Sequence, residues 1–404
     1  MTDLRLLFLT RAVRMFGYGL LSVVLVLYLT SLAWSAAEIG LLLALTLLGD
    51  AVVSLWLTTH ADRIGRRRVL ISGALLMLAA GIAFVATPIY VVVLAAATIG
   101  VVSPSGNEVG PFLAVEQASL SQIVGNDRRT SVFARYQLTG SFATAIGALA
   151  GGGLAQIVIS TGASAVDAYR WVIVAYAVGG LLLAILFSRA SARIEVPPTE
   201  MTDATIRTRL GLHRSQRIVL RLSALFALDA FAGGFVIAGF ITLWFSSRFG
   251  MDPAALGALI FGANLLAGLS ALAAGPLARR FGLIRTMVFT HLPSNVLLLL
   301  VPFMPTLPLA AGVLLVRFSI SQMDVPTRQS YTIAIVAPDE RSAAAGVTGI
   351  ARSLGVAASP LIAAPLYLSA ALAWTPFVIA GSLKIVYDVL LYRGFRANPA
   401  PEER

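Results

Sequence analysis

Residues 62–68 read DRIGRRR and place one acidic and four basic side chains on seven consecutive positions. The chain around them is apolar, because 58% of its 404 residues are hydrophobic, 12% are charged and the mean hydropathy is +0.86. These values are far from those of a water-soluble domain, so the chain is expected to lie in a membrane. The charged stretch is then predicted to be a loop at the membrane surface.

Apolar runs long enough to cross about 30 Å of hydrocarbon occur on both sides of this loop, with few polar residues between them. The run at 91–124 contains SPSGNEVGP and is predicted to be one helix kinked by Pro104, Gly106 and Pro111, or a loop leading into a helix. No room is left for a separate catalytic domain, so an enzyme is not expected. Roughly twelve spans are predicted, at 5–30, 36–58, 69–88, 91–124, 131–159, 169–188, 218–246, 253–277, 285–304, 307–336, 342–369 and 373–393.

Arginines gather in alternate loops, among them 62–68 and 279–280. Because positively charged loops stay on the cytoplasmic side, both termini are predicted to be cytoplasmic, with the chain as a multi-pass protein of the inner (plasma) membrane. The polar segment 191–217 falls on the same side and is predicted to link an N-terminal six-helix half, 1–190, to a C-terminal six-helix half, 218–404. The net charge of +11 is assigned to loops that attract anionic headgroups, so membrane lipids and not nucleic acid are expected as partners.

The two halves repeat each other at two places. ADRIGRRR (61–68) aligns with ARRFGLIR (278–285), and EQASLSQIVGNDRRTS (116–131) aligns with RQSYTIAIVAPDERSA (328–343). The first alignment lies between the second and third spans of each half, and the second includes the loop after the fourth span. Because each alignment matches equivalent places in the two halves, the two support one another. Among the identical pairs are Arg63 with Arg280, Gly65 with Gly282, Arg68 with Arg285, Gln117 with Gln329, Ile123 with Ile335, Val124 with Val336, Asp127 with Asp339 and Arg129 with Arg341.

With six spans in each half and DRIGRRR after the second span, the chain resembles the major facilitator superfamily over nearly its whole length. The signature loop of that family reads D-R-x-G-R-[RK]-[RK]. The resemblance implies an all-α integral membrane fold of twelve transmembrane helices in two pseudo-symmetric halves. It also implies that Asp62 and Arg66, with Arg63 and Gly65 in the same loop, grip a neighbouring helix end and stabilise the outward-facing state. The alternative is that the arginines only anchor the topology.

Three positions depart from the patterns of the family. Thr58 stands where the family has a glycine four residues before the aspartate, and Arg279 stands where the second copy of the loop would carry the aspartate. GALAGG (147–152) resembles the G-P-x-x-G-G motif of the family's antiporters, with Ala148 in place of proline. Small residues in a membrane helix also allow close packing against a neighbour, which is the alternative interpretation.

Charges inside apolar spans are costly unless they are paired or hydrated, so they mark candidate sites. In the family the first, fourth, seventh and tenth helices line the central cavity, and these spans carry Arg14, Glu116, Asp229 and Arg328. The repeat superposes Glu116 on Arg328 and Arg14 on Asp229, so opposite charges are expected to face each other twice. Arg328 would hold Glu116 ionised while the halves are apposed, and Glu116 would take up a proton when they separate. The alternative is two ion pairs that lock the halves together.

Polar residues near these charges complete the predicted substrate and proton site. Tyr18 follows Arg14 by one helical turn, Gln117 and Gln329 lie beside the central pair, and Asp324 precedes Arg328 by one turn. The alternative role of Asp324 is only to neutralise Arg328. His60 and His291 are too isolated to indicate a metal site, so no metal is expected. Six further charges in spans stay unranked: Asp50, Glu108, Arg317, Arg352, Lys384 and Asp388.

These features predict a secondary active transporter that works by alternating access, with proton-coupled export of a small organic or drug-like compound as the first hypothesis. Drug exporters of the family commonly carry an arginine in the fourth helix, whereas this chain has none between Arg68 and Arg128. Proton-coupled transport of a small anionic or zwitterionic solute, or of a metalloid oxyanion, is therefore the second hypothesis. A multi-span sensor or lipid-handling protein is the third, although it would not need opposed charges in both halves. No cofactor is expected, since no G-x-x-x-x-G-K-[ST] motif occurs, and a monomer is expected.

Overall fold

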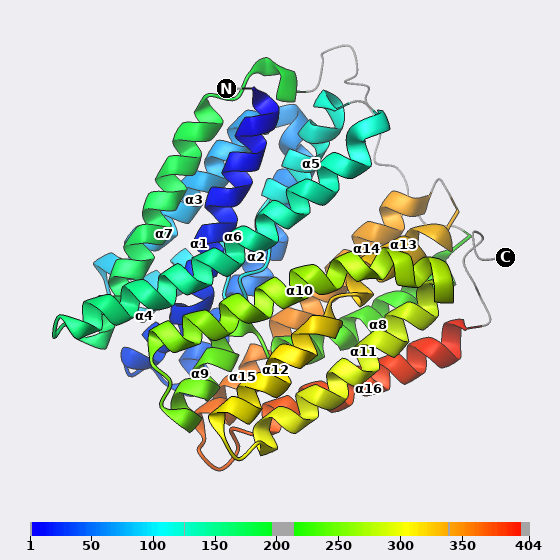
Figure 1. Ribbon diagram of the computed structural model, residues 1–404. Coiled ribbons are helices and arrows are strands. Elements are labelled where there is room, and N and C mark those ends of the chain that lie inside the picture. Colours follow the sequence, from blue (N-terminus) through cyan, green and yellow to red (C-terminus); the bar gives the residue numbers. More distant parts are fainter. Residues whose placement is uncertain (1, 125, 196–213, 338–339, 397–404) are drawn as a thin grey trace. The chain divides into compact units, whose positions relative to one another are not determined.

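The structure is a computed structural model, and it describes residues 2–124, 126–195, 214–337 and 340–396. The side chains of Thr59, Asp62, 126–131 and Ser342 lie outside this description. Within the described ranges the chain forms α-helices and short 3-10 turns and contains no strand (Figure 1). The predicted all-α fold class is therefore confirmed.

The chain divides into two compact units. Unit 1 is Met1–Ala204 together with Ala238–Phe261, and unit 2 is Thr205–Ile237 together with Gly262–Arg404. Most of the predicted cytoplasmic linker, 191–217, falls on residues 196–213 and so lies outside the described residues.

Unit 1 is built around its first helix. It contains α1 (Asp3–Ser31), α2 (Ala36–Ile64), α3 (Arg66–Ala86), α4 (Tyr90–Ile99), α5 (Phe112–Ile123), α6 (Asn126–Ser160), α7 (Ala165–Ser188), the 3-10 turn η1 (Ala192–Ile194) and α9 (Ala238–Phe249). Figure 1 shows α1, in dark blue, flanked by α6 and α7, and the three helices pack together. Glycines allow the close approach, because a Cβ on Gly19 would lie 2.2 Å from the Thr144 carbonyl oxygen and one on Gly147 would lie 2.1 Å from that of Phe16.

Unit 2 is built around α8 in the same way. It contains α8 (Gln216–Gly234), the later part of α10 (Pro253–Phe281), α11 (Leu283–Leu300), the 3-10 turn η3 (Val301–Phe303), α12 (Leu307–Ser321), α13 (Asp324–Ala334), α14 (Arg341–Ala358), α15 (Pro360–Leu368) and α16 (Thr375–Phe395). Helix α8 packs on α14 and α16, and α11 packs on α12, α13 and α16. At one end of this unit Leu222, Phe226, Met287, Tyr331 and Tyr387 form a buried apolar core.

The predicted spans match helical segments, but four of them are interrupted: the fourth between α4 and α5, the seventh between α8 and α9, the tenth between α12 and α13, and the eleventh between α14 and α15. In the part of the chain that the structure describes, eleven helical segments are long and apolar enough to cross a membrane. The expectation of a single kinked helix at 91–124 is wrong, because α4 ends before Gly100 and α5 begins after Pro111. Proline has no N–H to continue a helix, and Gly106 and Gly110 take left-handed φ angles of 74° and 81° that most residues avoid.

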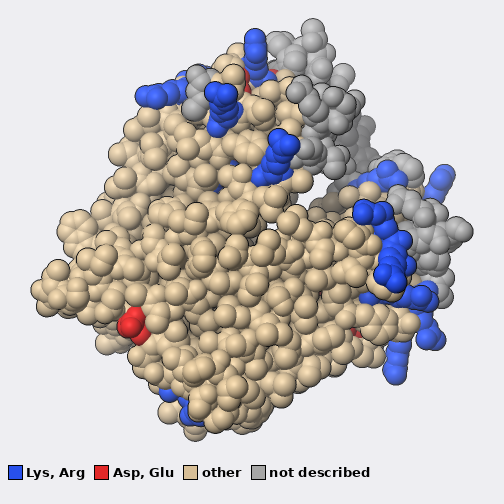
Figure 2. Space-filling view, in the orientation of Figure 1, with Lys and Arg blue, Asp and Glu red and all other residues tan. Residues whose placement is uncertain are grey.

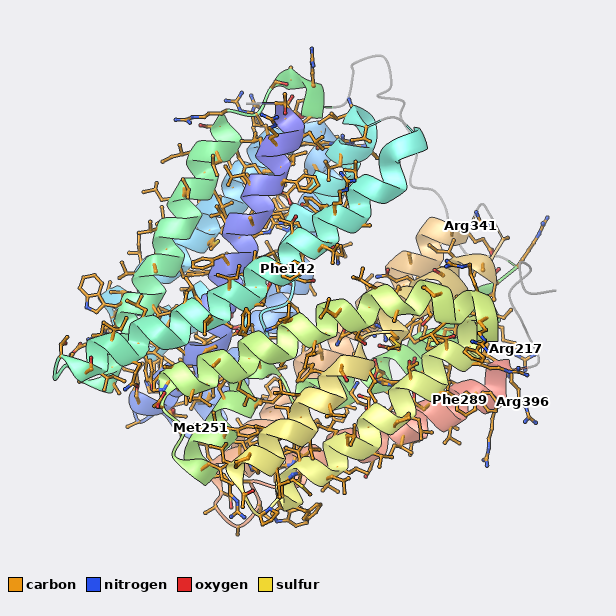
Figure 3. The ribbon with its side chains drawn as sticks, viewed as in Figure 1. Phe142, Arg217, Met251, Phe289, Arg341 and Arg396 are labelled. Atoms are coloured by element: carbon orange, nitrogen blue, oxygen red, sulfur yellow. The ribbon has the colours of Figure 1, made fainter. Side chains whose placement is uncertain are left out.

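The outer flanks of both units are apolar. On the face shown in Figure 2, the flanks carry almost no charged atoms, and Lys and Arg side chains stand near helix ends. Phe142 on α6 and Phe289 on α11 are 44% and 58% exposed (Figure 3). Figure 3 also shows Arg217, Arg341 and Arg396 at one end of unit 2. Large exposed apolar side chains on long helices are the surface that lipid covers, so the chain is a multi-pass membrane protein.

Candidate functional site

Four charged side chains meet inside unit 1, and we call them the N-terminal charge cluster: Arg11, Arg14, Glu108 and Glu116. Nη2 of Arg14 donates to Oε2 of Glu116 at 2.6 Å, and Nε of Arg14 donates to Oε1 of Glu108 at 2.8 Å. Nη1 of Arg11 donates to the second oxygen of Glu108 at 2.6 Å. Two bases therefore face two acids, and their charges balance.

Glu116 is completely buried and is held from several sides. Besides Arg14, it accepts a hydrogen bond from the Thr10 hydroxyl at 2.8 Å and another from the Tyr136 hydroxyl. The Arg11 guanidinium lies over the Tyr136 ring, 4.3 Å from its centre. Glu108 is the most accessible member of the cluster, with 15% of its side chain exposed.

The break between α4 and α5 brings Glu108 to the cluster. In a continuous helix two residues eight positions apart would be separated by about 12 Å along the axis. Because residues 100–111 are not helical, Glu108 and Glu116 instead bind the same guanidinium, that of Arg14. Non-helical backbone within a membrane-spanning region is tolerated where it is buried in protein or lines a cavity.

A second group of charges lies inside unit 2 around Asp229 on α8. Oδ1 of Asp229 accepts from Nζ of Lys384 at 2.6 Å, and Oδ2 accepts from Nη1 of Arg328 at 3.1 Å and from Nη1 of Arg352 at 3.3 Å. The same Arg328 nitrogen lies 3.0 Å from Oδ2 of Asp324. We call this group the C-terminal charge cluster: Asp229, Asp324, Arg328, Arg352 and Lys384.

A buried histidine extends this cluster toward α16. Nδ1 of His291 lies 2.9 Å from Oδ1 of Asp388, and Nε2 of His291 lies 4.0 Å from Oδ1 of Asp229. Asn295 donates to the second oxygen of Asp388 at 2.9 Å. His291 therefore stands between two carboxylates of the same unit. No group of three or more His, Cys, Asp or Glu side chains within the described residues is arranged to hold a metal ion.

The structure shows the ion pairs that the four central charges form within each unit. Arg14 binds Glu116 inside unit 1, and Asp229 binds Arg328 inside unit 2. The predicted apposition of Glu116 with Arg328 and of Arg14 with Asp229 across the two halves stays a prediction. The repeat thus relates two equivalent ion pairs of reversed polarity, because the first and fourth spans of one half are close enough to pair directly.

The other predicted neighbours differ in what they contact. Asp324 does bind Arg328, whereas the Tyr18 hydroxyl donates to the backbone oxygen of Val109 at 3.1 Å. Gln117 is partly buried and Gln329 is exposed, and neither side chain hydrogen-bonds to a described residue. Adjacent helical residues point about 100° apart, so a glutamine next to a buried charge faces elsewhere.

Several residues of the two clusters carried only a weak signal in the sequence. Arg11 precedes Arg14 by one turn, a spacing that places both on one helix face. The charges at Glu108, Arg352, Lys384 and Asp388 were visible in spans, but nothing in the sequence showed which partners they would meet. His291 had been set aside as isolated, and its carboxylate partners come from helices distant in the chain.

The signature loop, 62–68, contains a sharp turn at Gly65. Its Arg66 side chain hydrogen-bonds to the segment that follows α7. Gly65 has a φ angle of 102° between α2 and α3, and Gly282 has a φ angle of 87° between α10 and α11. Nη1 of Arg66 donates to Oε1 of Gln122 at 2.8 Å and to the backbone oxygen of Ile194 at 3.2 Å. Arg63 is exposed. The predicted role of the Asp62 side chain lies outside the described residues.

A carboxylate does lie at the neighbouring helix start, and it belongs to Glu195. Its two oxygens accept from the backbone N–H groups of Arg66 at 2.7 Å and Arg67 at 3.1 Å, the first residues of α3. The positive end of a helix dipole favours such a carboxylate. Glu195 was missed because it lies about 130 residues along the chain from the loop it binds.

Comparison with known proteins identifies the family of the chain. The profile of the Major Facilitator Superfamily matches residues 7–360. The uncharacterized membrane protein YJR124C of Saccharomyces cerevisiae is 30% identical over 417 residues, which cover 96% of this chain and 93% of that protein. The solved nucleoside transporter NupG has a TM-score of 0.75 at 14% identity, covering 98% of this chain and 100% of that chain. A D-xylose-proton symporter has a TM-score of 0.74 at 15% identity, covering 99% and 98%. With its helical spans, its repeated glycine turns and this match over most of its length, the chain belongs to the major facilitator superfamily and is a membrane transporter rather than an enzyme.

Proposed function

We propose that the protein couples a proton to the movement of a small solute by alternating access, with Glu116 as the proton carrier. The observation that carries the proposal is the burial of Glu116, which forms an ion pair with Arg14. A buried carboxylate that gains a proton no longer needs its cation. Arg14 already contacts Glu108 as well, so it has a second carboxylate to bind when Glu116 is neutral. The N-terminal charge cluster can therefore exist in two arrangements.

Asp229 is the less suitable carrier. Three cations, Lys384, Arg328 and Arg352, already contact its two oxygens. A proton on Asp229 would remove the counter-ion that the three cations share and would leave the buried Lys384 without a contacting acid, which is costly. We therefore assign Asp229 the task of holding the basic residues of unit 2 in place.

The structural neighbours support a small polar solute. One is a nucleoside transporter and another is a D-xylose-proton symporter, which also supports coupling to protons. Export, with proton influx, is the direction we propose, in the inner (plasma) membrane with both termini cytoplasmic. Reporters fused within 191–217 should then read as cytoplasmic, and reporters within 160–168 as external.

The GALAGG stretch gives export no separate support. A Cβ on Gly151 would lie 2.8 Å from the Leu20 carbonyl oxygen, and one on Gly152 would lie 2.1 Å from that of Pro253. Close helix packing therefore accounts for the small residues there. A second candidate function, transport of an anionic or zwitterionic solute, is favoured by the surplus of basic groups in unit 2.

The proton carrier can be tested in proteoliposomes with the full chain. The assay would measure concentrative flux on an imposed pH gradient, and exchange at equal pH, for nucleosides, pentoses and small carboxylates. Glu116→Gln imitates the protonated acid, so exchange should survive while gradient-driven accumulation is lost. Asp167→Asn, an exposed surface acid, is the matched control and should behave as wild type. Gradient-driven accumulation by Glu116→Gln at the wild-type level would reject Glu116 as the carrier.

A further inference from the structure

Arg317 on α12 is a buried arginine that pairs with no acid in the described part of the chain. Only 7% of the residue is exposed, its Nε is buried without a hydrogen bond, and no described residue forms an ion pair or hydrogen bond with it. Its guanidinium lies over the ring of Phe318, its neighbour in sequence, 4.7 Å from the ring centre. An arginine stays charged in a protein and is costly to bury alone. The position therefore calls for an anion.

The three described acids around Asp229 already have partners. Asp388 binds His291 and Asn295, and Asp324 binds Arg328. Asp229 is shared by three other cations. Asp324 and Asp229 attract Arg317 electrostatically, but neither is in contact with it. Among the described residues around Asp229, four basic side chains thus face three acids: Arg317, Arg328, Arg352 and Lys384 against Asp229, Asp324 and Asp388.

A second unsatisfied group lies on the same helix face as Arg317. Ser321 follows it by four residues, the spacing that places side chains one above the other on a helix. The Ser321 hydroxyl is also buried and also has no hydrogen-bond partner among the described residues. Two orphaned donors, one charged and one neutral, therefore occur within a single turn of α12.

These donors lie at an interruption of the tenth span. Helix α12 ends at Ser321 and α13 begins at Asp324. The ends of discontinuous membrane helices are common places for solute sites, because the free backbone groups and nearby side chains bind polar ligands. The observations thus indicate one ligand site at the break in the tenth span, and they predict a ligand that is negatively charged and accepts hydrogen bonds.

We propose that Arg317 and Ser321 bind the oxyanion group, a carboxylate or a phosphate, of the transported solute. The planar guanidinium binds both oxygens of such a group at once, and its hydroxyl neighbour binds a further lone pair. The bound anion also removes the surplus positive charge. This inference rests on the proposed transport function and names the class of solute.

Thermal unfolding of the purified full-length protein can test the binding site. The probes are sodium lactate, sodium benzoate and sodium phosphate, each compared with sodium chloride at equal ionic strength, and uridine and D-xylose as neutral solutes. A carboxylate or phosphate, but not chloride, should raise the unfolding midpoint of the wild type. A response to lactate or benzoate alone assigns a carboxylate, and a response to phosphate alone assigns a phosphate. Stabilisation by uridine or D-xylose with no response to any oxyanion would overturn the inference.

Substitution of Arg317 separates a binding residue from a structural one. Arg317→Met should abolish the oxyanion response and, because it removes an uncompensated charge, should raise the ligand-free midpoint by about 2 °C. A structural arginine would lower that midpoint instead. Arg285→Met, an exposed arginine of the same unit, should change neither quantity. An oxyanion response that persists in Arg317→Met would refute the site.

Ser321→Ala tests the contribution of the hydroxyl to oxyanion binding. Ser321→Ala leaves all charges in place and should weaken oxyanion binding by roughly tenfold, the loss expected for one hydrogen bond to a charged group. Unchanged affinity in Ser321→Ala would remove Ser321 from the site.

A transport assay separates the site from the proposed function. If oxyanion binding depends on Arg317 but wild-type vesicles show no pH-driven oxyanion flux, the site stands and the proposed function fails. If Arg317→Met still carries a solute at the wild-type rate, the transport function stands and the site fails.

Discussion

Both charge clusters pair buried acids with bases, but they differ in how the charges are balanced. In unit 1 two arginines face two glutamates, and each charge has an opposite charge in contact. In unit 2 one aspartate contacts three cations, and a fourth cation, Arg317, has no ion-pair partner among the described residues. A balanced cluster can change state by moving one proton, whereas a cluster with a surplus cation is completed by an anion. This difference is the basis of the two proposals above, proton handling in unit 1 and binding of the solute's charge in unit 2.

The largest effect should come from breaking the balance of the N-terminal charge cluster. Arg14→Met leaves Glu116 buried without a cation, which should cost about 3–5 kcal/mol of folding stability. The thermal midpoint and the folded yield in detergent should both fall sharply. The same substitution at Arg317 is expected to have the opposite sign. A mild effect at Arg14 would mean that the two clusters do not differ in balance.

The second effect tests whether Asp229 is served by more cations than it needs. Lys384→Met removes one of three contacts, so the aspartate keeps Arg328 and Arg352. The loss should be close to that of one charged hydrogen bond, about 2 kcal/mol, and so smaller than at Arg14. Thermal unfolding of the two variants side by side measures the difference. Equal losses of stability in Lys384→Met and Arg14→Met would show that the remaining cations do not compensate for the loss of Lys384.

The third prediction concerns the turns that both units share. Gly65→Ala and Gly282→Ala force an L side chain into the left-handed region, which should cost about 1–2 kcal/mol at each site. A Cβ on Gly65 would have ordinary contact distances to Glu195, so backbone strain and not a clash is the cause. Similar shifts of the two midpoints are expected. A much larger shift at one glycine would show that the loops are not equivalent.

The repeated elements were the most predictable part of the fold. Alignment of the two halves placed Gly65 on Gly282, and both residues adopt the same kind of turn. The register that superposes Glu116 on Arg328 also superposes the first residue of α5 on the first residue of α13. Local features of this kind follow from glycine, proline and apolar periodicity, which act over a few neighbouring residues.

The pairing of charges was the least predictable part. A span with a charge has to meet a partner, but the partner lies about 100 residues away for Arg14 and Asp229 alike. The contacts of Glu108 with Arg11 and Arg14 depend in turn on the break at residues 100–111, since Glu108 reaches them only when the helix is interrupted. The lack of a partner at Arg317 is likewise a property of the packed helices and has no local signature.

The smallest expected effect concerns the carboxylates that hold helix starts, one in each unit. Glu195 accepts from the first two N–H groups of α3, and Glu340 accepts from the N–H groups of Arg214 and Ser215, just before α8. Glutamine keeps an acceptor oxygen but loses the charge that favours the positive end of the helix, so each change should cost about 0.5–1 kcal/mol. Added salt should shrink the difference between wild type and Glu195→Gln, because Glu195 is part-exposed, and should leave Glu340→Gln unchanged, because Glu340 is buried. Thermal midpoints at low and high ionic strength measure both variants. An equal response to salt at the two positions would show that burial does not separate them.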